Sequence, residues 1–83
     1  MTAMNIFQLE VLDAVVKHGT FSDAALELEV SQSAVSRAIA SLEAELGVPL
    51  LIRGRSGAKL TAVGERILSH AQQILSLLEL LDY

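Results

Sequence analysis

The sequence of 83 residues contains no cysteine, which excludes disulfide bonds and thiolate metal sites. It has only three aromatic residues, Phe7, Phe21 and Tyr83, so the core must be built from Leu, Ile, Val and Ala. No uninterrupted apolar run approaches the length that spans a bilayer, and the first residues lack the basic region of a signal peptide. We therefore expect one small cytoplasmic domain without a membrane partner.

Positive charge is also scarce, because six Lys and Arg residues face ten Asp and Glu residues and the net charge is −4. That balance at first argues against a nucleic-acid partner. However, five of the six basic residues lie between residues 31 and 66, and phosphate contacts need local positive charge rather than a basic protein. The alternative interpretation is that these are ordinary solvated charges.

Patterns typical of catalysis and metal binding are missing as well. His18 and His70 lie far apart in the sequence, and each falls near or on an expected helix. The chain has no phosphate-binding loop, no Gly-x-Ser-x-Gly motif and no spacing typical of a structural zinc site. We expect neither an enzyme nor a metal site, and no cofactor in this chain.

Apolar periodicity predicts two helices in the first 30 residues. The first covers residues 6–18 and ends at Gly19. The second begins at Ser22, with Thr20 as the other candidate cap, and ends near Glu29; the small Ala24 and Ala25 on one face allow a close helix crossing. The apolar face of the first helix comprises Phe7, Leu9, Val11, Leu12, Val15 and Val16.

A third helix is predicted from Ser31, a good N-cap, to about Leu46, with Gly47 and Pro49 as stop signals. At 100° per residue its two faces differ sharply. The buried face comprises Val35, Ile39, Leu42 and Leu46, and the outward face Ser33, Arg37, Ala40 and Ala44, with Gln32 and Ser36 on one flank. Because the outward face begins with small polar residues, it can approach another surface closely.

The next segment is predicted to be a β-hairpin. Residues 50–53 form the first strand, residues 54–57 the turn and residues 58–60 the returning strand. Arg53 and Arg55 give the tip region a positive charge.

A last helix is predicted from Thr61 to about Leu81. It carries too many apolar residues for one stripe, so we expect part of its surface to pair with a second copy of the chain. The alternative is that it simply folds over its own domain. The residues predicted for this dimer contact are Ile67, Leu68, Ala71, Ile74, Leu75 and Leu78.

Two helices joined by a tight turn at Glu29 and Val30 predict a helix-turn-helix, whose second helix enters the major groove of DNA. Gln pairs with adenine, Arg with guanine, and Ser with several bases. Arg53 and Arg55 would enter the minor groove or contact phosphate, and Lys59 would contact phosphate. The predicted DNA-contact residues are Ser31, Gln32, Ser33, Ser36, Arg37, Arg53, Arg55 and Lys59.

The run FSDAALELEVSQSAVSRAIASLEAELGVPL at residues 21–50 resembles the signature of LysR-type transcriptional regulators, and LTAVG at residues 60–64 resembles the start of their linker helix. The resemblance implies a mainly α fold, with a winged helix-turn-helix over residues 1–60 and a linker and dimerisation helix over residues 61–83. It implies binding to double-stranded promoter DNA as a homodimer, with a tetramer and RNA polymerase as further partners at full length, hence a nucleoid-associated location.

The sequence departs from this family's pattern at several positions. Ser33 stands where the family often has Pro, Leu51 where it often has an aromatic residue, and Ile52 where it often has an acidic one. Arg55 lies one place before the second hairpin arginine of the family, and Ser56 occupies the usual position.

Length is the largest departure, because family members carry a longer C-terminal domain that senses a small-molecule inducer. Nothing here encodes that domain, so we expect a fragment of a longer regulator, with a naturally short relative as the alternative. A winged helix that binds only protein is the competing functional hypothesis.

Overall fold

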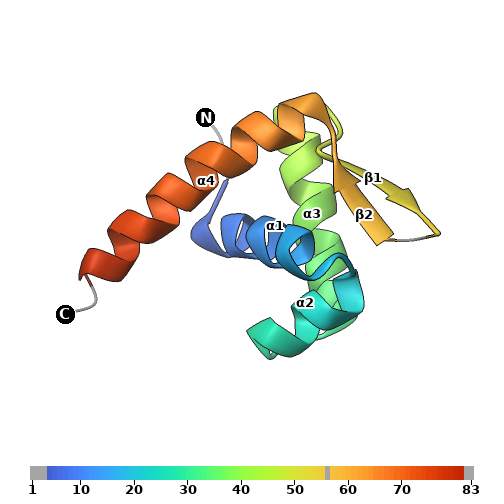
Figure 1. The fold of residues 1–83 in the computed structure, drawn as a ribbon, viewed down its shortest axis with the longest axis horizontal. Helices are drawn as coiled ribbons and strands as arrows, with labels where there is room; N and C mark the ends of the chain where they lie inside the picture. The colour runs from blue at the N-terminus through green and yellow to red at the C-terminus, as the bar shows by residue number, and fades with distance from the viewer. Residues whose placement is uncertain (1–3, 56, 82–83) are drawn as a thin grey trace.

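The computed structural model describes residues 4–55 and 57–81. Helices α1, α2 and α3 form a compact bundle, a two-stranded hairpin extends from one end of it, and α4 crosses α1 before running outward (Figure 1). This is the expected mainly α architecture with one hairpin. The elements are α1 (Ile6–His18), α2 (Phe21–Leu28), α3 (Gln32–Leu46), β1 (Leu51–Gly54), β2 (Gly57–Leu60) and α4 (Ala62–Leu81).

Polar side chains fix the helix starts. Asn5 and Gln8 form a reciprocal capping box at α1, and the Ser31 hydroxyl accepts a hydrogen bond from the Ala34 amide at the start of α3. At α2, the Thr20 hydroxyl accepts from the Asp23 amide at 3.1 Å, so the helix begins at Phe21 rather than at Ser22. Thr20, the alternative cap in the sequence, is therefore the correct one.

A tight turn joins α2 to α3. Glu29 adopts the left-handed conformation at φ 58°, and the Val30 amide donates to the Ala25 carbonyl at 3.1 Å. This turn confirms the predicted helix-turn-helix and sets the crossing of α3 against the small residues of α2.

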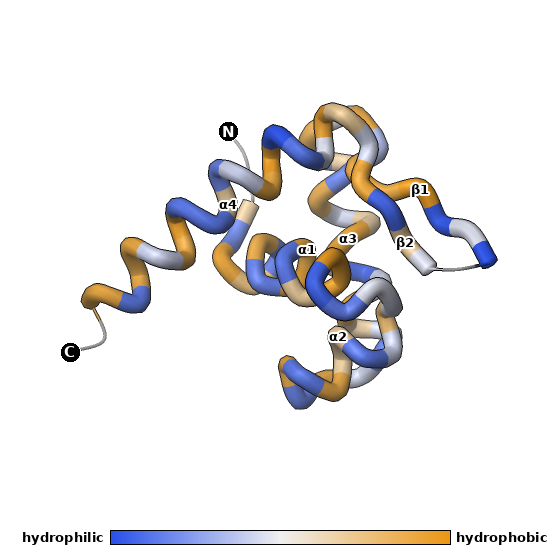
Figure 2. The backbone as a smooth tube through the Cα atoms, viewed as in Figure 1, coloured by the Kyte–Doolittle hydropathy of each residue, from blue (hydrophilic) through white to orange (hydrophobic). Residues whose placement is uncertain are grey.

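The core lies where α1, α2 and α3 meet, and the first strand and the first half of α4 complete it. Val35, Ile39 and Leu42 of α3 are buried as predicted, whereas Leu46 is only partly buried at its edge. Figure 2 shows the apolar segments of α1 and α3 lying side by side at the centre. The fully buried large side chains are Val11, Leu12, Val15, Val35, Ile39, Leu42 and Leu50.

The start of α1 differs from the prediction. Phe7 is 37% exposed and does not belong to the apolar face, whereas Gln8 is buried. The Gln8 side chain takes this place because it accepts from the Asn5 amide at 3.0 Å and donates to Glu45 of α3 at 3.4 Å. A satisfied polar side chain can replace an apolar one in the core.

The hairpin is antiparallel, with Leu51 opposite Leu60 and Arg53 opposite Ala58. Leu50 precedes β1 and Gly57 already belongs to β2, so both strands start one residue away from their predicted positions. Because side chains alternate between faces, Arg53 shares the inner face with buried Leu51, while Ile52 and Lys59 lie on the outer face. Ser56 lies outside the described residues.

The first half of α4 belongs to the core. Leu68 is 8% exposed and Ala71 1%, which leaves them almost no surface for a second chain. We therefore remove these two residues from the predicted dimer contact, since α1 already covers them. Further along, Leu77, Leu80 and Leu81 are 63–78% exposed where α4 runs beyond the bundle. Among the described residues, no helix is long and apolar enough to cross a membrane.

Candidate nucleic-acid interface

The N-terminal half of α3 presents the predicted recognition residues outward. Gln32, Ser33 and Arg37 are exposed, and Ser36 is partly buried on the flank that faces the hairpin. Ser33 is not a free hydroxyl, because its Oγ lies 3.1 Å from the Oγ of the capping Ser31. The result is a surface of short polar side chains with one long cation, which another molecule can approach closely.

Arg53 lies at the seam between the hairpin and the helix-turn-helix. Its Cζ is 4.1 Å from the centroid of the Phe21 ring, and its Nη2 donates to the Ser36 hydroxyl at 3.5 Å. A cavity of about 230 Å³ opens there, lined by Thr20, Phe21, Gln32, Ser36, Arg53, Gly54, Gly57 and Ala58. The structure thus brings together Gln32, Ser36 and Arg53, which lie on two different elements.

The hairpin is attached to the junction of α1 and α2. The Ala58 amide donates to the Gly19 carbonyl at 3.0 Å. Gly57 lies at φ +116°, and a Cβ there would collide with the same Gly19 oxygen. Only glycine suits this backbone conformation and this close approach. Gly57 therefore lets the first residues of β2, next to the hairpin turn, lie against the bundle.

A second attachment comes from α3. The Glu43 carboxylate accepts hydrogen bonds from the amides of Leu50 and Leu51 at 2.7 and 3.2 Å. On the other side, the Thr61 amide donates to the Leu50 carbonyl at 2.9 Å. Glu43 therefore fixes the angle at which the hairpin leaves α3.

Replacing Glu43 with Ala is expected to lower the free energy of unfolding by about 1–3 kcal/mol, because two amides lose a charged acceptor. Chemical denaturation measures this change. The exposed Glu65 carries the same side chain and has no such contact with Leu50 or Leu51, so Glu65→Ala is the matched control. Equal losses in the two variants would contradict the role assigned to Glu43.

Arg55 and Lys59 do not join the Arg53 cluster. Arg55 is exposed in the turn of the hairpin, and Lys59 is exposed on the face opposite to Arg53. The hairpin thus offers positive charge in several directions. Among the described residues, no group of His, Cys, Asp and Glu is arranged to hold a metal ion.

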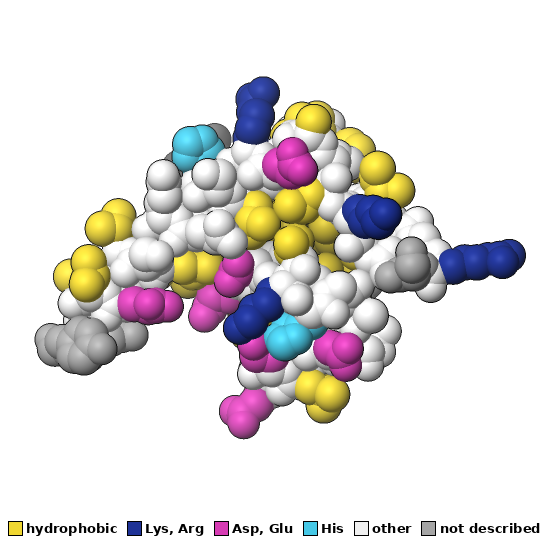
Figure 3. All heavy atoms as spheres, viewed as in Figure 1, with side chains coloured by type: hydrophobic (Ala, Val, Ile, Leu, Met, Phe, Trp, Pro, Cys, Tyr) yellow, Lys and Arg dark blue, Asp and Glu magenta, His cyan; other side chains and the backbone are white. Residues whose placement is uncertain are grey.

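Charge is segregated on the surface. Glu10, Asp13, Glu27 and Glu79 line a groove formed by α1, α2 and α4. Figure 3 shows most acidic side chains over α1, α2 and the outer half of α4, with one basic side chain among them, whereas the other Lys and Arg side chains in this view stand around the hairpin and the start of α4. Although the chain is acidic overall, its hairpin end can therefore approach a polyanion without direct opposition from this cluster.

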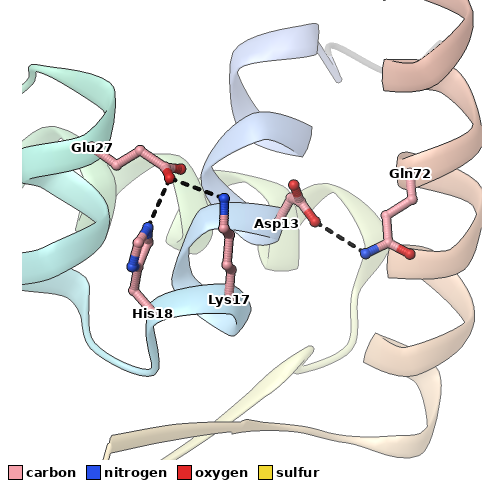
Figure 4. A network of polar contacts seen from close by, with 5 residues as sticks. All are labelled: Asp13, Lys17, His18, Glu27 and Gln72. Carbon is pink, nitrogen blue, oxygen red and sulfur yellow. Dashed lines mark hydrogen bonds and ion pairs between the residues drawn. The ribbon is translucent and has the colours of Figure 1, made fainter.

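Polar contacts also join the helices behind the interface (Figure 4). Hydrogen bonds from His18 at 2.8 Å and from Lys17 at 3.3 Å lower the pKa of the Glu27 carboxyl from its ordinary value. The stability that the ionised Glu27 carboxylate gains from these contacts is present at neutral pH and is lost as the pH falls through the lowered pKa. It is small because the group is exposed. Gln72 of α4 donates to Asp13 of α1 at 3.1 Å.

Two residues that shape this interface are absent from the sequence predictions. Phe21 was interpretable only as an apolar residue at a helix start, because its contact with Arg53 spans 32 positions of sequence. Glu43 offered a usable signal: it directly follows buried Leu42 and lies four residues after buried Ile39, on a flank that a solvated carboxylate would avoid.

Residues 6–65 match the family model described as "Bacterial regulatory helix-turn-helix protein, lysR family". Similar proteins include the probable HTH-type transcriptional regulator LrrA of Synechococcus elongatus, 66% identical over 74 residues, or 89% of this chain and 25% of LrrA. A probable RuBisCO transcriptional regulator of Nostoc is 47% identical over 84% of this chain and 21% of its own length. The chain thus spans about a quarter of the length of these curated relatives, which are regulators and not enzymes.

Solved structures agree with this relationship. The crystal structure of a CbnR_DBD-DNA complex matches with a TM-score of 0.87 and 42% identity, over 92% of this chain and 87% of that one. A BenM_DBD/catB site 1 DNA complex matches with a TM-score of 0.89 and 36% identity, over 94% and 88% of the two chains. Because the family model matches residues 6–65, most of its length, the chain belongs to the lysR family of bacterial regulatory helix-turn-helix proteins.

Proposed function

We propose that this chain binds double-stranded promoter DNA in a sequence-dependent manner, with the first turns of α3 in the major groove and the hairpin beside it. The observation that carries the proposal is the convergence of Gln32 and Ser36 of α3 with Arg53 of the hairpin around one outward-facing cavity. The DNA complexes of CbnR_DBD and BenM_DBD, both more than a third identical to this chain, support it.

The side chains on α3 match the hydrogen-bonding groups of base edges. Gln32 can pair with adenine in a bidentate manner, Arg37 can pair with guanine, and the Ser36 hydroxyl can donate or accept. Ser33, which shares its hydroxyl contact with Ser31, keeps the start of the helix small. Short side chains here let the helix backbone come near the groove floor, and the helix N-terminus favours a nearby phosphate.

The hairpin cations have different tasks under this proposal. Arg53 lies nearest to α3 and would contact the backbone or the minor groove next to the bases that α3 reads. Arg55 at the turn would reach further along the duplex. Lys59, on the outer face, would contact phosphate without reading sequence.

A homodimer through α4 completes the proposal. Ile67, Ile74, Leu75 and Leu78 remain the predicted contact, and exposed Leu77 and Leu81 extend the apolar surface. Two paired chains would place their α3 helices on successive major-groove faces. In a chain as long as those of the relatives, a C-terminal domain would bind an inducer, and a tetramer and RNA polymerase would be further partners.

Replacing Ile74 with Glu is expected to raise the dimer dissociation constant at least about tenfold, because two carboxylates would meet in an apolar contact. Analytical ultracentrifugation measures the change. Ser76 is exposed and lies about 200° around the helix from Ile74. Ser76→Glu adds the same charge outside the predicted contact and should leave the dimer intact. Equal dissociation of the two variants would contradict the assigned interface.

The DNA-binding proposal is tested by fluorescence anisotropy of a labelled duplex titrated with the protein at several salt concentrations. We expect binding that weakens steeply with salt, because each phosphate contact releases counterions. Arg53→Ala should weaken binding while leaving the dimer unchanged. A folded, dimeric chain that binds no duplex at low salt would overturn the proposal in favour of a protein-interaction module.

A further inference from the structure

We propose that Phe21 is a positioning residue of the DNA interface: its ring holds the Arg53 guanidinium at the seam between the hairpin and α3. This inference rests on the proposed function and deepens it, because it assigns how one cation is oriented toward the DNA. Phe21 packs against the edge of the core, and its ring also lies against the Arg53 guanidinium, whose Cζ is 4.1 Å from the ring centroid. The proposal rests on this second contact.

The ring is itself held in a fixed position. Phe21 is the first residue of α2, directly after the capping Thr20, and is partly buried against the core. An anchored ring presents one face to the cation, and the attraction between a guanidinium and an aromatic face requires that geometry. The flexible partner of the pair is therefore Arg53, and the rigid one is Phe21.

The hairpin delivers Arg53 to this ring. Arg53 shares the inner face of β1 with buried Leu51, and its cross-strand neighbour Ala58 is hydrogen-bonded to the Gly19 carbonyl. The junction of α1 and α2 thus holds both the hairpin backbone and, through Phe21, the arginine side chain. One short segment, residues 19–21, sets the distance between the hairpin and the helix-turn-helix.

The held cation remains available for a polyanion. In the described part of the chain, the ion pairs are those of Lys17 and His18 with Glu27, so no carboxylate there neutralises Arg53. Its Nη2 reaches only the neutral Ser36 hydroxyl of α3, at 3.5 Å. Stacking on Phe21 therefore limits the rotamers of Arg53 without consuming its charge, which lowers the entropy lost when DNA binds.

The first test uses the free protein and needs no DNA. The side-chain proton signals of Arg53 should be shifted upfield in the NMR spectrum by the ring current of Phe21. Phe21→Leu should remove this shift and Phe21→Tyr should keep it. Leu28→Ala, a change at another partly buried α2 residue remote from the hairpin, should also keep it. Arg53 signals at ordinary positions in the unsubstituted protein would overturn the inference.

The second test is a double-mutant cycle of duplex affinity. Phe21→Leu is expected to weaken binding about two- to fivefold, the size of an exposed cation–π contact. It should have no further effect in an Arg53→Ala background. The Phe21→Tyr variant, which keeps an aromatic ring, should bind with the affinity of the unsubstituted protein. An equal loss with and without Arg53 would show a merely structural role and overturn the inference. Failure of the unsubstituted protein to bind any duplex would instead contradict the proposed function.

Discussion

Gly64→Ala is expected to lower the free energy of unfolding by on the order of 3 kcal/mol, at the upper end of overpacking effects. Gly64 is buried in the first turn of α4, and a Cβ there would collide with the Leu50 carbonyl oxygen. That oxygen also accepts the hydrogen bond from the Thr61 amide at 2.9 Å. Because the atoms that block the new methyl group belong to the backbone, either Leu50 or the first turn of α4 would have to move. Either movement would disrupt the junction between the hairpin and α4.

Thermal and chemical denaturation measure this effect, and Gly54→Ala is the matched control. At Gly54 the nearest atom to an added Cβ would be the Gly57 oxygen at 3.9 Å, an ordinary contact, and the backbone does not adopt a positive φ. The control should therefore change stability by less than about 1 kcal/mol. Similar losses in the two variants would show that the close approach of α4 to Leu50 is not the cause.

Arg37→Ala is expected to weaken binding to the preferred DNA site by about 1–3 kcal/mol, or roughly five- to 150-fold. Arg37 is exposed on the outward face of α3, where its guanidinium can pair with a guanine edge. The loss should fall on one base pair, so the variant should accept other bases at that position. Competition assays with single-base variants of the site measure the change.

Lys59→Ala provides the contrast for Arg37. Lys59 is exposed on the outer face of the hairpin, opposite Arg53. Its loss should weaken binding to all duplexes alike and reduce the slope of log affinity against log salt by about 1. Equal changes in base preference and in salt slope for the two variants would contradict this division of tasks.

Local signals in the sequence were sufficient to predict most of the fold. Asn5, Thr20 and Ser31 cap the starts of α1, α2 and α3, and Gly19 and Gly47 end α1 and α3, because the groups that satisfy the terminal amides are close in sequence. The helical periodicity of α3 correctly predicted that Val35, Ile39 and Leu42 are buried, but it also placed Leu46 in the core and did not include buried Ala38. The misplaced start of α2 arose because Thr20 and Ser22 are both good caps, and only the Asp23 contact distinguishes them.

The site was less predictable because its contacts are long-range. The Arg53–Phe21 stack and the Glu43 contacts with Leu50 and Leu51 depend on how the hairpin docks, which no local pattern encodes. For α4, periodicity identified an apolar surface but did not separate the part that α1 covers from the part left exposed. Leu68 and Ala71 therefore proved to be core, whereas exposed Leu77 and Leu81 were not assigned to the contact.

The most direct test of the central claim is selection of bound sequences from a pool of random duplexes. We expect enrichment of a two-part site with dyad symmetry, because two α3 helices held by paired α4 helices read two half-sites. The Arg37→Ala variant should select the same spacing with one relaxed position in each half. A folded, dimeric chain that enriches no sequence would contradict sequence-dependent DNA binding by this protein.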